Sequence, residues 1–129
     1  MKILITGGAG FIGSNVADML IAKKHDAVII DNLSSGFEYN VNKEAKLIKA
    51  DITDFDKIEK IFNEEKPEII YHFAAQIDVR KSVSDPIFDA KTNIMATLNL
   101  IKPLISFFYA FAKINFWLKT HIFFYFFII

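Results

Sequence analysis

The stretch Thr6-Gly-Gly-Ala-Gly-Phe-Ile-Gly13 follows the apolar run Ile3–Ile5 and leads into an apolar-periodic segment that reaches Ile21. A buried strand that turns through glycines into a helix is typical of a pyrophosphate-binding site. The glycines permit a tight turn, leave backbone bare for phosphate oxygens and let the helix pack closely on the strand. A glycine-rich turn without a ligand is the alternative, but the strand, the helix and a later acid all favour the binding site.

Length and composition limit the class of protein. The 129 residues are enough for one domain with a core but few for a two-domain enzyme. Fifteen basic and fifteen acidic residues cancel, which argues against nucleic acid and anionic membranes as partners. The absence of cysteine excludes disulfides and cysteine-ligated zinc. Glycines and Asp18 interrupt the apolar stretch after Met1, so we expect no signal peptide and a cytoplasmic location.

Short β-branched runs alternate with longer helical patterns, which is typical of βαβ units and a parallel sheet. The predicted strands span residues 2–6, 27–31, 45–50 and 68–73, and the predicted helices span 11–24, 54–64 and 86 to about 102. This pattern predicts an α/β fold, the first half of a doubly wound Rossmann sheet with strand order 3-2-1-4.

Local signals predict how the helices begin and pack. Thr53, with Asp56 three residues later, resembles a capping box, and Asp85-Pro86 predicts a cap followed by proline at the first helical position. The apolar positions expected to face the sheet from the first helix are Phe11, Val16, Leu20 and Ile21. Arg80 and Lys81 could meet a phosphate of the ligand, but we expect them in a solvent-facing loop.

The composition changes after Lys102. Residues 103–129 hold eight of the fourteen phenylalanines, the only tryptophan and no acid. Their uncharged runs are too short to span a bilayer. The chain is therefore divided into 1–102, the N-terminal part of a nucleotide-binding Rossmann domain, and 103–129, an atypical apolar and aromatic tail. Two hypotheses account for the tail: a frameshift or truncation after about Ile101, or a segment that lends a fifth strand beside the fourth.

Two acids follow strands at the same edge of the predicted sheet. Asp31 ends the second strand eighteen positions after Gly13, where a carboxylate can accept hydrogen bonds from the adenosine ribose hydroxyls. A 2′-phosphate there would meet a like charge, and residues 32–34 supply no arginine, which favours NAD over NADP. Asp51-Ile52 follows the third strand and could contact adenine, with an ordinary turn as the alternative.

The sequence resembles the extended short-chain dehydrogenase/reductases and, within them, the NAD-dependent UDP-glucose 4-epimerases. The resemblance covers residues 1–101 and rests on the blocks 6–14, 31–36, 72–76, 79–82, 85–86 and 93–100. Ala96 stands where glycine is usual. The block at 31–36 favours the epimerases over the related nucleotide-sugar 4,6-dehydratases, which remain an alternative.

The resemblance implies an isomerase of galactose metabolism, in which NAD faces a UDP-sugar and sugar C4 is oxidised and re-reduced through a 4-keto intermediate. It also implies a homodimer. The cofactor-binding residues that it implies are Gly7, Gly10, Phe11, Ile12, Gly13, Asp31, Asn32, Gly36, Asp51, Ile52, Phe73, Ala74, Ala75 and Asn93.

The catalytic residues of that family are not recognisable in this chain. The resemblance implies a Tyr-x-x-x-Lys motif after a fifth strand that carries a serine or threonine. Tyr109 and Lys113 have this spacing, but so do Tyr39 and Lys43 in a predicted loop, and Tyr109 follows a crossover helix instead of a fifth strand. We therefore predict an inactive portion of an epimerase, with a non-catalytic NAD-binding module or a membrane-attached protein as alternatives.

His72 is the histidine nearest to the predicted site. It ends an apolar strand, and no carboxylate or histidine cluster surrounds it in the sequence. We therefore predict a packed, hydrogen-bonded core histidine in place of a general acid or a metal ligand, and no metal site in this chain.

Overall fold

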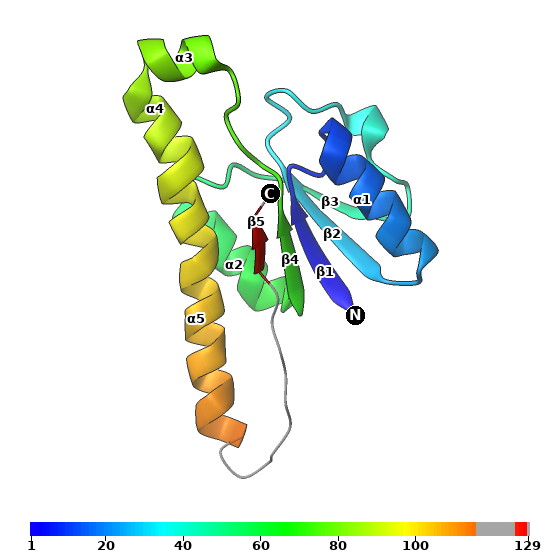
Figure 1. Ribbon diagram of the computed structural model, residues 1–129. Helices are drawn as coiled ribbons and strands as arrows, with labels where there is room; N and C mark the ends of the chain where they lie inside the picture. The colour runs from blue at the N-terminus through cyan, green and yellow to red at the C-terminus, as the bar shows by residue number, and fades with distance from the viewer. Residues whose placement is uncertain (116–125, 129) are drawn as a thin grey trace.

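A computed structural model describes residues 1–115 and 126–128, with side chains described through residue 106. The strands form one parallel sheet in the order β3-β2-β1-β4-β5 (Figure 1). The strands are β1 (Lys2–Thr6), β2 (Asp26–Asp31), β3 (Lys46–Lys49), β4 (Ile69–His72) and β5 (Phe126–Ile128). The predicted order 3-2-1-4 is confirmed, and β5 extends the sheet beside β4, where the second hypothesis for the tail puts a fifth strand.

Helices cover both faces of the sheet. The helix α1 (Phe11–Ala22) lies on one face, and α2 (Phe55–Glu65) and α5 (Ala96–Asn115) lie on the other (Figure 1). Shorter helical segments complete the chain: η1 (Glu38–Asn40), α3 (Val79–Ser84), α4 (Pro86–Ala90) and the π-helical η2 (Lys91–Met95). Within the described range 1–115, no helix is both long and apolar enough to cross a bilayer.

Alternate residues of the central strands supply two cores. Ile3 and Ile5 of β1 pack toward α1, whereas Leu4 packs with Ile58 of α2 and Leu100 of α5. Because both faces are covered, the central strands are apolar at nearly every position, as expected for a buried parallel sheet. The core therefore holds the carboxyl ends of four neighbouring strands in fixed register.

Two predictions about helix starts are wrong. Phe11 does not pack on the sheet, because α1 begins at this residue, directly after the glycine turn, and leaves the side chain 85% exposed. The cap of α2 is Asp54, whose side chain accepts the Lys57 N–H at 3.1 Å. The Thr53 hydroxyl, which the predicted capping box would use, instead donates to Asp51.

The chain from residue 79 onward is more helical than predicted. Arg80 and Lys81 lie in α3 and not in a loop, because Asp78 caps this helix; the Arg80 side chain is nevertheless 92% exposed. The cap at Asp85 with Pro86 in the first turn of α4 is confirmed. The predicted end near Lys102 is wrong, because α5 continues through Pro103 to Asn115. The predicted boundary at 102/103 therefore falls inside one helix.

A buried carboxylate, that of Glu65, lies at the amino edge of the sheet. Glu65, at the end of α2, is 6% exposed and accepts hydrogen bonds from Lys46 and, at 3.1 Å, from Lys2. The hydrogen bond from Lys46, together with that from Lys2, holds the pKa of the Glu65 carboxyl below its ordinary value of 4.5, although burial acts in the opposite direction. The ionised form is therefore part of the folded state.

We expect Glu65→Gln to lower the free energy of unfolding by about 1–3 kcal/mol at pH 7, because it weakens two charge-assisted hydrogen bonds. A lowered pKa stabilises the fold above pH 4.5, and this contribution is lost as the pH falls through the folded-state pKa. Urea denaturation should thus show a smaller difference in the free energy of unfolding between Glu65→Gln and the unsubstituted chain below pH 4 than at pH 7. Glu64→Gln is the control, since Glu64 is exposed and 3.9 Å from Lys60. Equal effects of the two substitutions would contradict this role.

Candidate functional site

The predicted cofactor-binding residues gather at the carboxyl edge of the sheet. Because the strands are parallel, the segments that follow β1, β2, β3 and β4 all emerge at this edge. The glycine turn follows β1, Asp31 ends β2, Asp51 follows β3 and residues 73–75 follow β4. Asn93, in η2, joins them through a hydrogen bond to Gln76. Residues far apart in the sequence therefore meet at one edge.

Two glycines make the turn after β1 possible. Gly7 has φ +70°, and a Cβ there would lie 2.6 Å from the Ala74 nitrogen. A Cβ on Gly13 would lie 2.3 Å from the Gly7 carbonyl oxygen. Both neighbours are backbone atoms, so a side chain at either position would force the turn, the helix or the end of β4 to move.

Gly10 differs from these two glycines because space next to its Cα is open. The one heavy atom near a Cβ built there is the Gly7 carbonyl oxygen, at 3.3 Å. Gly10 also precedes α1, and no side chain in the described part of the chain caps that helix. Its first-turn N–H groups therefore face outward past bare backbone, which suits a phosphate group.

The loop after β2 packs on the glycine turn. The carbonyl of Ala9 accepts the Phe37 N–H at 3.1 Å and the Asn40 side-chain amide at 2.9 Å. A Cβ on Gly36 would lie 2.8 Å from the backbone carbon of Ala9, so only glycine allows this approach. The loop thus supports the turn from its outer side.

Asp31 joins the end of β2 to the same turn. Its side chain is 8% exposed and accepts the Ala9 N–H at 2.9 Å on one oxygen and the Leu33 N–H at 2.8 Å on the other. Each carboxylate oxygen can accept a second hydrogen bond. The carboxylate is therefore fixed in place with acceptor capacity left for ribose hydroxyls.

Asp51 is hydrogen-bonded to Asn32, the residue that follows Asp31. It accepts hydrogen bonds from the Asn32 amide at 2.9 Å and from the Thr53 N–H and hydroxyl at 2.8 and 2.7 Å. Burial raises the pKa of the Asp51 carboxyl, but these hydrogen bonds outweigh it and leave that pKa below its ordinary value. Ile52, in contrast, is 6% exposed and packs in the core under α2 and α5, so its side chain does not face the site edge.

Asn93 acts on the site through the backbone of Gln76. Its side-chain oxygen accepts the Gln76 N–H at 2.8 Å, and its amide donates to the Gln76 carbonyl at 2.9 Å and to Asp89 at 3.1 Å. Asn93 lies in the π-helical η2, a distortion often found at functional sites. This clamp fixes the segment after Ala75, and neither Gln76 nor Asp89 is among the predicted site residues.

The predicted motif residues Tyr109 and Lys113 lie on α5, with side chains outside the described part of the structure. Between β4 and Tyr109 the chain forms helices and connections without another strand. Among the residues whose side chains are described, no three acids or histidines gather as metal ligands. In the described part of the chain, therefore, no fifth strand precedes Tyr109 and Lys113, although the resemblance implies one before the catalytic motif.

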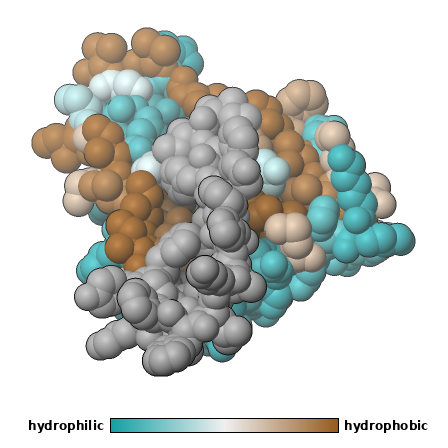
Figure 2. All heavy atoms as spheres, turned by 60° about the horizontal axis from the view of Figure 1, so that its bottom comes forward, coloured by the Kyte–Doolittle hydropathy of each residue, from teal (hydrophilic) through white to brown (hydrophobic). Residues whose placement is uncertain are grey.

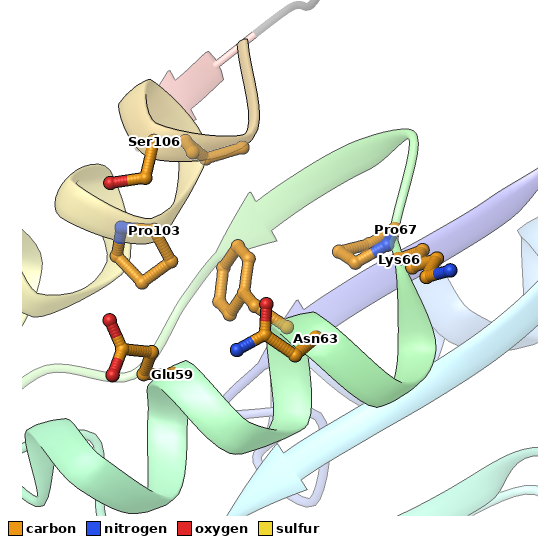
Figure 3. Close-up of a pocket in the computed structure, with 8 residues that line it drawn as sticks. Glu59, Asn63, Lys66, Pro67, Pro103 and Ser106 are labelled. Atoms are coloured by element: carbon orange, nitrogen blue, oxygen red, sulfur yellow. The ribbon is translucent and has the colours of Figure 1, made fainter. Parts of the chain in front are cut away.

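A separate pocket of about 180 Å³ lies between α2 and α5. Figure 3 shows Pro103 and Ser106 of α5 across from Glu59 and Asn63 of α2. Lys66 and Pro67, which also line the pocket, precede β4 and so lie at the amino edge of the sheet. This pocket is distinct from the glycine turn.

Comparisons with known proteins show which family the chain belongs to. Residues 4–117 match the family described as GDP-mannose 4,6 dehydratase. The chain is 47% identical over 100 residues to a putative UDP-glucose 4-epimerase of Methanocaldococcus jannaschii, a match that covers 78% of this chain and 32% of that protein. A UDP-glucose 4-epimerase of Mycolicibacterium smegmatis is 46% identical over 105 residues, with 78% and 33% covered.

Solved structures give the same result. The UDP-glucose 4-epimerase of Thermotoga maritima with UDP-glucose has a TM-score of 0.80 and 46% identity, with 82% of this chain and 34% of that chain covered. The enzyme of Thermus thermophilus in complex with NAD has a TM-score of 0.77 and 39% identity, with 80% and 33% covered. The chain thus spans about a third of the length of these relatives. From the family match and these identities, the chain belongs to the GDP-mannose 4,6 dehydratase family of NAD-dependent nucleotide-sugar epimerases and dehydratases.

Proposed function

We propose that this chain binds NAD at the carboxyl edge of its sheet and is the NAD-binding portion of a UDP-glucose 4-epimerase. The observation that carries the proposal is the start of α1, where no side chain caps the helix and Gly10 leaves the backbone bare. The turn before this helix is held to the buried Asp31 carboxylate, which accepts the Ala9 N–H at 2.9 Å. NAD, when bound, supplies hydride acceptance and return at the sugar. The residues of this chain bind and orient it.

Each part of the site would hold a different part of the dinucleotide. The first-turn N–H groups of α1 suit the pyrophosphate, and Asp31 suits the ribose hydroxyls of the adenosine half. Asp51, held to Asn32 at 2.9 Å, lies further along the same edge, where adenine would follow. The negative charges of Asp31 and Asp51 would repel the 2′-phosphate of NADP, which supports NAD over NADP.

We propose that this chain does not complete the epimerase reaction alone. The support is the position of Tyr109 on α5, which follows β4 without an intervening strand in the described part of the chain. A UDP-sugar would then be a partner of a longer enzyme only. The non-catalytic NAD-binding module stays a second proposal, favoured by the parallel pairing of β5 with β4. The proposed setting is cytoplasmic galactose metabolism.

Calorimetric titration with NAD and NADP tests the proposed function. We expect saturable NAD binding and at least tenfold weaker NADP binding. An assay of UDP-glucose conversion with added NAD should show no turnover. Absence of NAD binding would overturn the proposed function, and turnover that Tyr109→Phe abolishes would overturn the proposed inactivity.

The origin of residues 103–129 is a separate proposal. Phenylalanine, isoleucine, lysine, asparagine and tyrosine dominate this segment and have codons rich in A and T, as expected for an A/T-rich gene read out of frame. We propose that a frameshift replaced the sequence after about Ile101. The other two reading frames of the downstream DNA should then encode a Tyr-x-x-x-Lys motif and further strands. Their absence would contradict the frameshift.

We also propose that the chain forms a homodimer through its long helical arm. Apolar residues on α4, η2 and α5 are more than half exposed: Ile87, Ile94, Met95, Leu98 and Ile105. Figure 2 shows apolar surface on the side where Figure 1 places α4 and α5. Ile87, Ile94, Leu98 and Ile105 recur at intervals of seven, four and seven, a spacing that forms one stripe on a helix.

Sedimentation equilibrium tests the dimer. We expect a mass of twice 14.8 kDa for the chain and a monomer for Leu98→Glu, because a charge in the middle of the stripe would be buried on association. Lys23→Glu is the control and should leave the dimer intact, because Lys23 is exposed at the end of α1, which covers the opposite face of the sheet (Figure 1). A monomeric unsubstituted chain would refute the dimer.

A further inference from the structure

We infer that His72 is a positioning residue that, as the neutral Nε2–H form, connects the glycine turn, the end of β4 and the helix carrying Asn93. The inference rests on the proposed NAD site, since these three segments are the ones proposed to surround the cofactor. It adds a defined tautomer, and a direction for each hydrogen bond, to the predicted packed and hydrogen-bonded histidine.

The contacts of His72 run in both directions from the ring. Nδ1 lies 2.6 Å from the Thr6 hydroxyl, and Nε2 lies 3.1 Å from the Thr97 hydroxyl. The Thr97 hydroxyl in turn lies 2.7 Å from the Asn93 carbonyl oxygen, and the Ala74 N–H donates to the Thr6 hydroxyl oxygen at 3.4 Å. Thr6 and His72 are 0% and 5% exposed, so water does not compete for these groups.

The chemistry of these partners assigns every hydrogen. A carbonyl oxygen only accepts hydrogen bonds, so the Thr97 hydroxyl donates its one hydrogen to the Asn93 carbonyl oxygen. The Thr97 oxygen must then accept from His72, which puts the ring hydrogen on Nε2. The neutral ring has one N–H, so Nδ1 accepts from the Thr6 hydroxyl, whose oxygen is left to accept from Ala74.

The environment of the ring favours the neutral form that this chain of bonds requires. Burial lowers the pKa of His72 below its ordinary value of 6.5. Its two ring contacts in the described structure are hydroxyl groups, with no carboxylate among them. A neutral ring at pH 7 follows, with one donor and one acceptor matched to its two neighbours.

The position of the chain of bonds gives it a function. Thr6 directly precedes Gly7, whose turn closes against Ala74. Thr97 bonds the backbone of Asn93, whose side chain holds both backbone groups of Gln76. His72 therefore acts on the two ends of segment 74–76 at once, through Thr6 on one side and through Thr97 and Asn93 on the other.

Thr97→Val tests the inference with little change of shape. Valine removes the acceptor for His72 and the donor to Asn93, and we expect NAD affinity to fall about five- to tenfold, the size of one net hydrogen bond. Thr97→Ser keeps the hydroxyl and should restore affinity to within twofold. Thr92→Val is the matched control, since Thr92 lies in the same helical arm and its hydroxyl is not part of this chain of bonds.

Nitrogen NMR of the His72 ring supplies a readout that packing alone would not change. The unsubstituted chain should show a protonated Nε2 and an unprotonated Nδ1, and Thr97→Val should give a mixture of tautomers. A ring with Nδ1–H in the unsubstituted chain overturns the inference even if a variant fails to fold. NAD affinity unchanged by Thr97→Val overturns it while leaving the proposed function intact, whereas a chain that binds no NAD refutes the proposed function itself.

Discussion

Gly13→Ala should destabilise the fold by about 3 kcal/mol and abolish NAD binding. The new Cβ would lie 2.3 Å from the Gly7 carbonyl oxygen and 2.8 Å from the Gly8 Cα. Overpacking costs about 1–3 kcal/mol when side chains can adjust, and here the neighbours are backbone atoms, so the upper end applies. Urea denaturation measures the loss of stability, and calorimetric titration measures NAD binding.

Gly10→Ala is the matched control in the same turn. Its Cβ would approach one atom, the Gly7 carbonyl oxygen at 3.3 Å, and the backbone at Gly10 is extended, with φ −79° and ψ 173°. We expect stability within about 0.5 kcal/mol of the unsubstituted chain, as for most substitutions without a clash. NAD affinity should still fall at least tenfold, because the methyl group occupies the open side of the turn.

The two alanine variants separate the functions of the glycines. If Gly13→Ala is as stable as the unsubstituted chain, the close packing of α1 on the turn does not require glycine at position 13. If Gly10→Ala binds NAD normally, the pyrophosphate does not approach this face. The expected pattern is one variant that loses stability and binding and one that loses binding alone.

The parts of the fold that depend on local pattern could be predicted from the sequence. Apolar runs such as Ile3–Ile5 are buried on both faces, so their composition alone indicates central parallel strands. Asp31 follows such a run and must lie at the carboxyl edge once the strands are parallel. The gathering of the glycine turn, Asp31 and Asp51 at that edge follows from these two facts, and the strand order follows from the Rossmann pattern of alternating strands and helices.

The rest depends on partners far apart in the sequence. Asn93 holds Gln76, seventeen residues away, and His72 joins Thr6 to Thr97, sixty-six and twenty-five residues away. No periodicity or spacing rule relates such pairs, so the clamp and the directed chain of bonds become visible only in three dimensions. Competition between neighbouring polar groups has the same effect at Asp54, which caps α2 because Asp51 takes the Thr53 hydroxyl.

Asp31→Asn should weaken NAD binding about ten- to a hundredfold, the range expected for hydrogen bonds to a charged group. The carboxylate accepts two backbone N–H groups, from Ala9 at 2.9 Å and Leu33 at 2.8 Å. An amide can accept only one of them with its oxygen, and its NH₂ group then faces the other N–H. The substitution thus disturbs the turn and removes the charge that the ribose hydroxyls would meet.

The ratio of NAD to NADP affinity distinguishes a direct role of the Asp31 charge from a loss of turn geometry. Loss of geometry weakens both nucleotides alike, whereas loss of the charge also removes repulsion of the 2′-phosphate, so the preference for NAD should fall by about tenfold. Asp18→Asn is the control, because Asp18 carries the same charge on the outer face of α1, where it bonds Asn42 at 2.7 Å. An unchanged ratio in Asp31→Asn would mean that this carboxylate supports the turn without contacting the ribose.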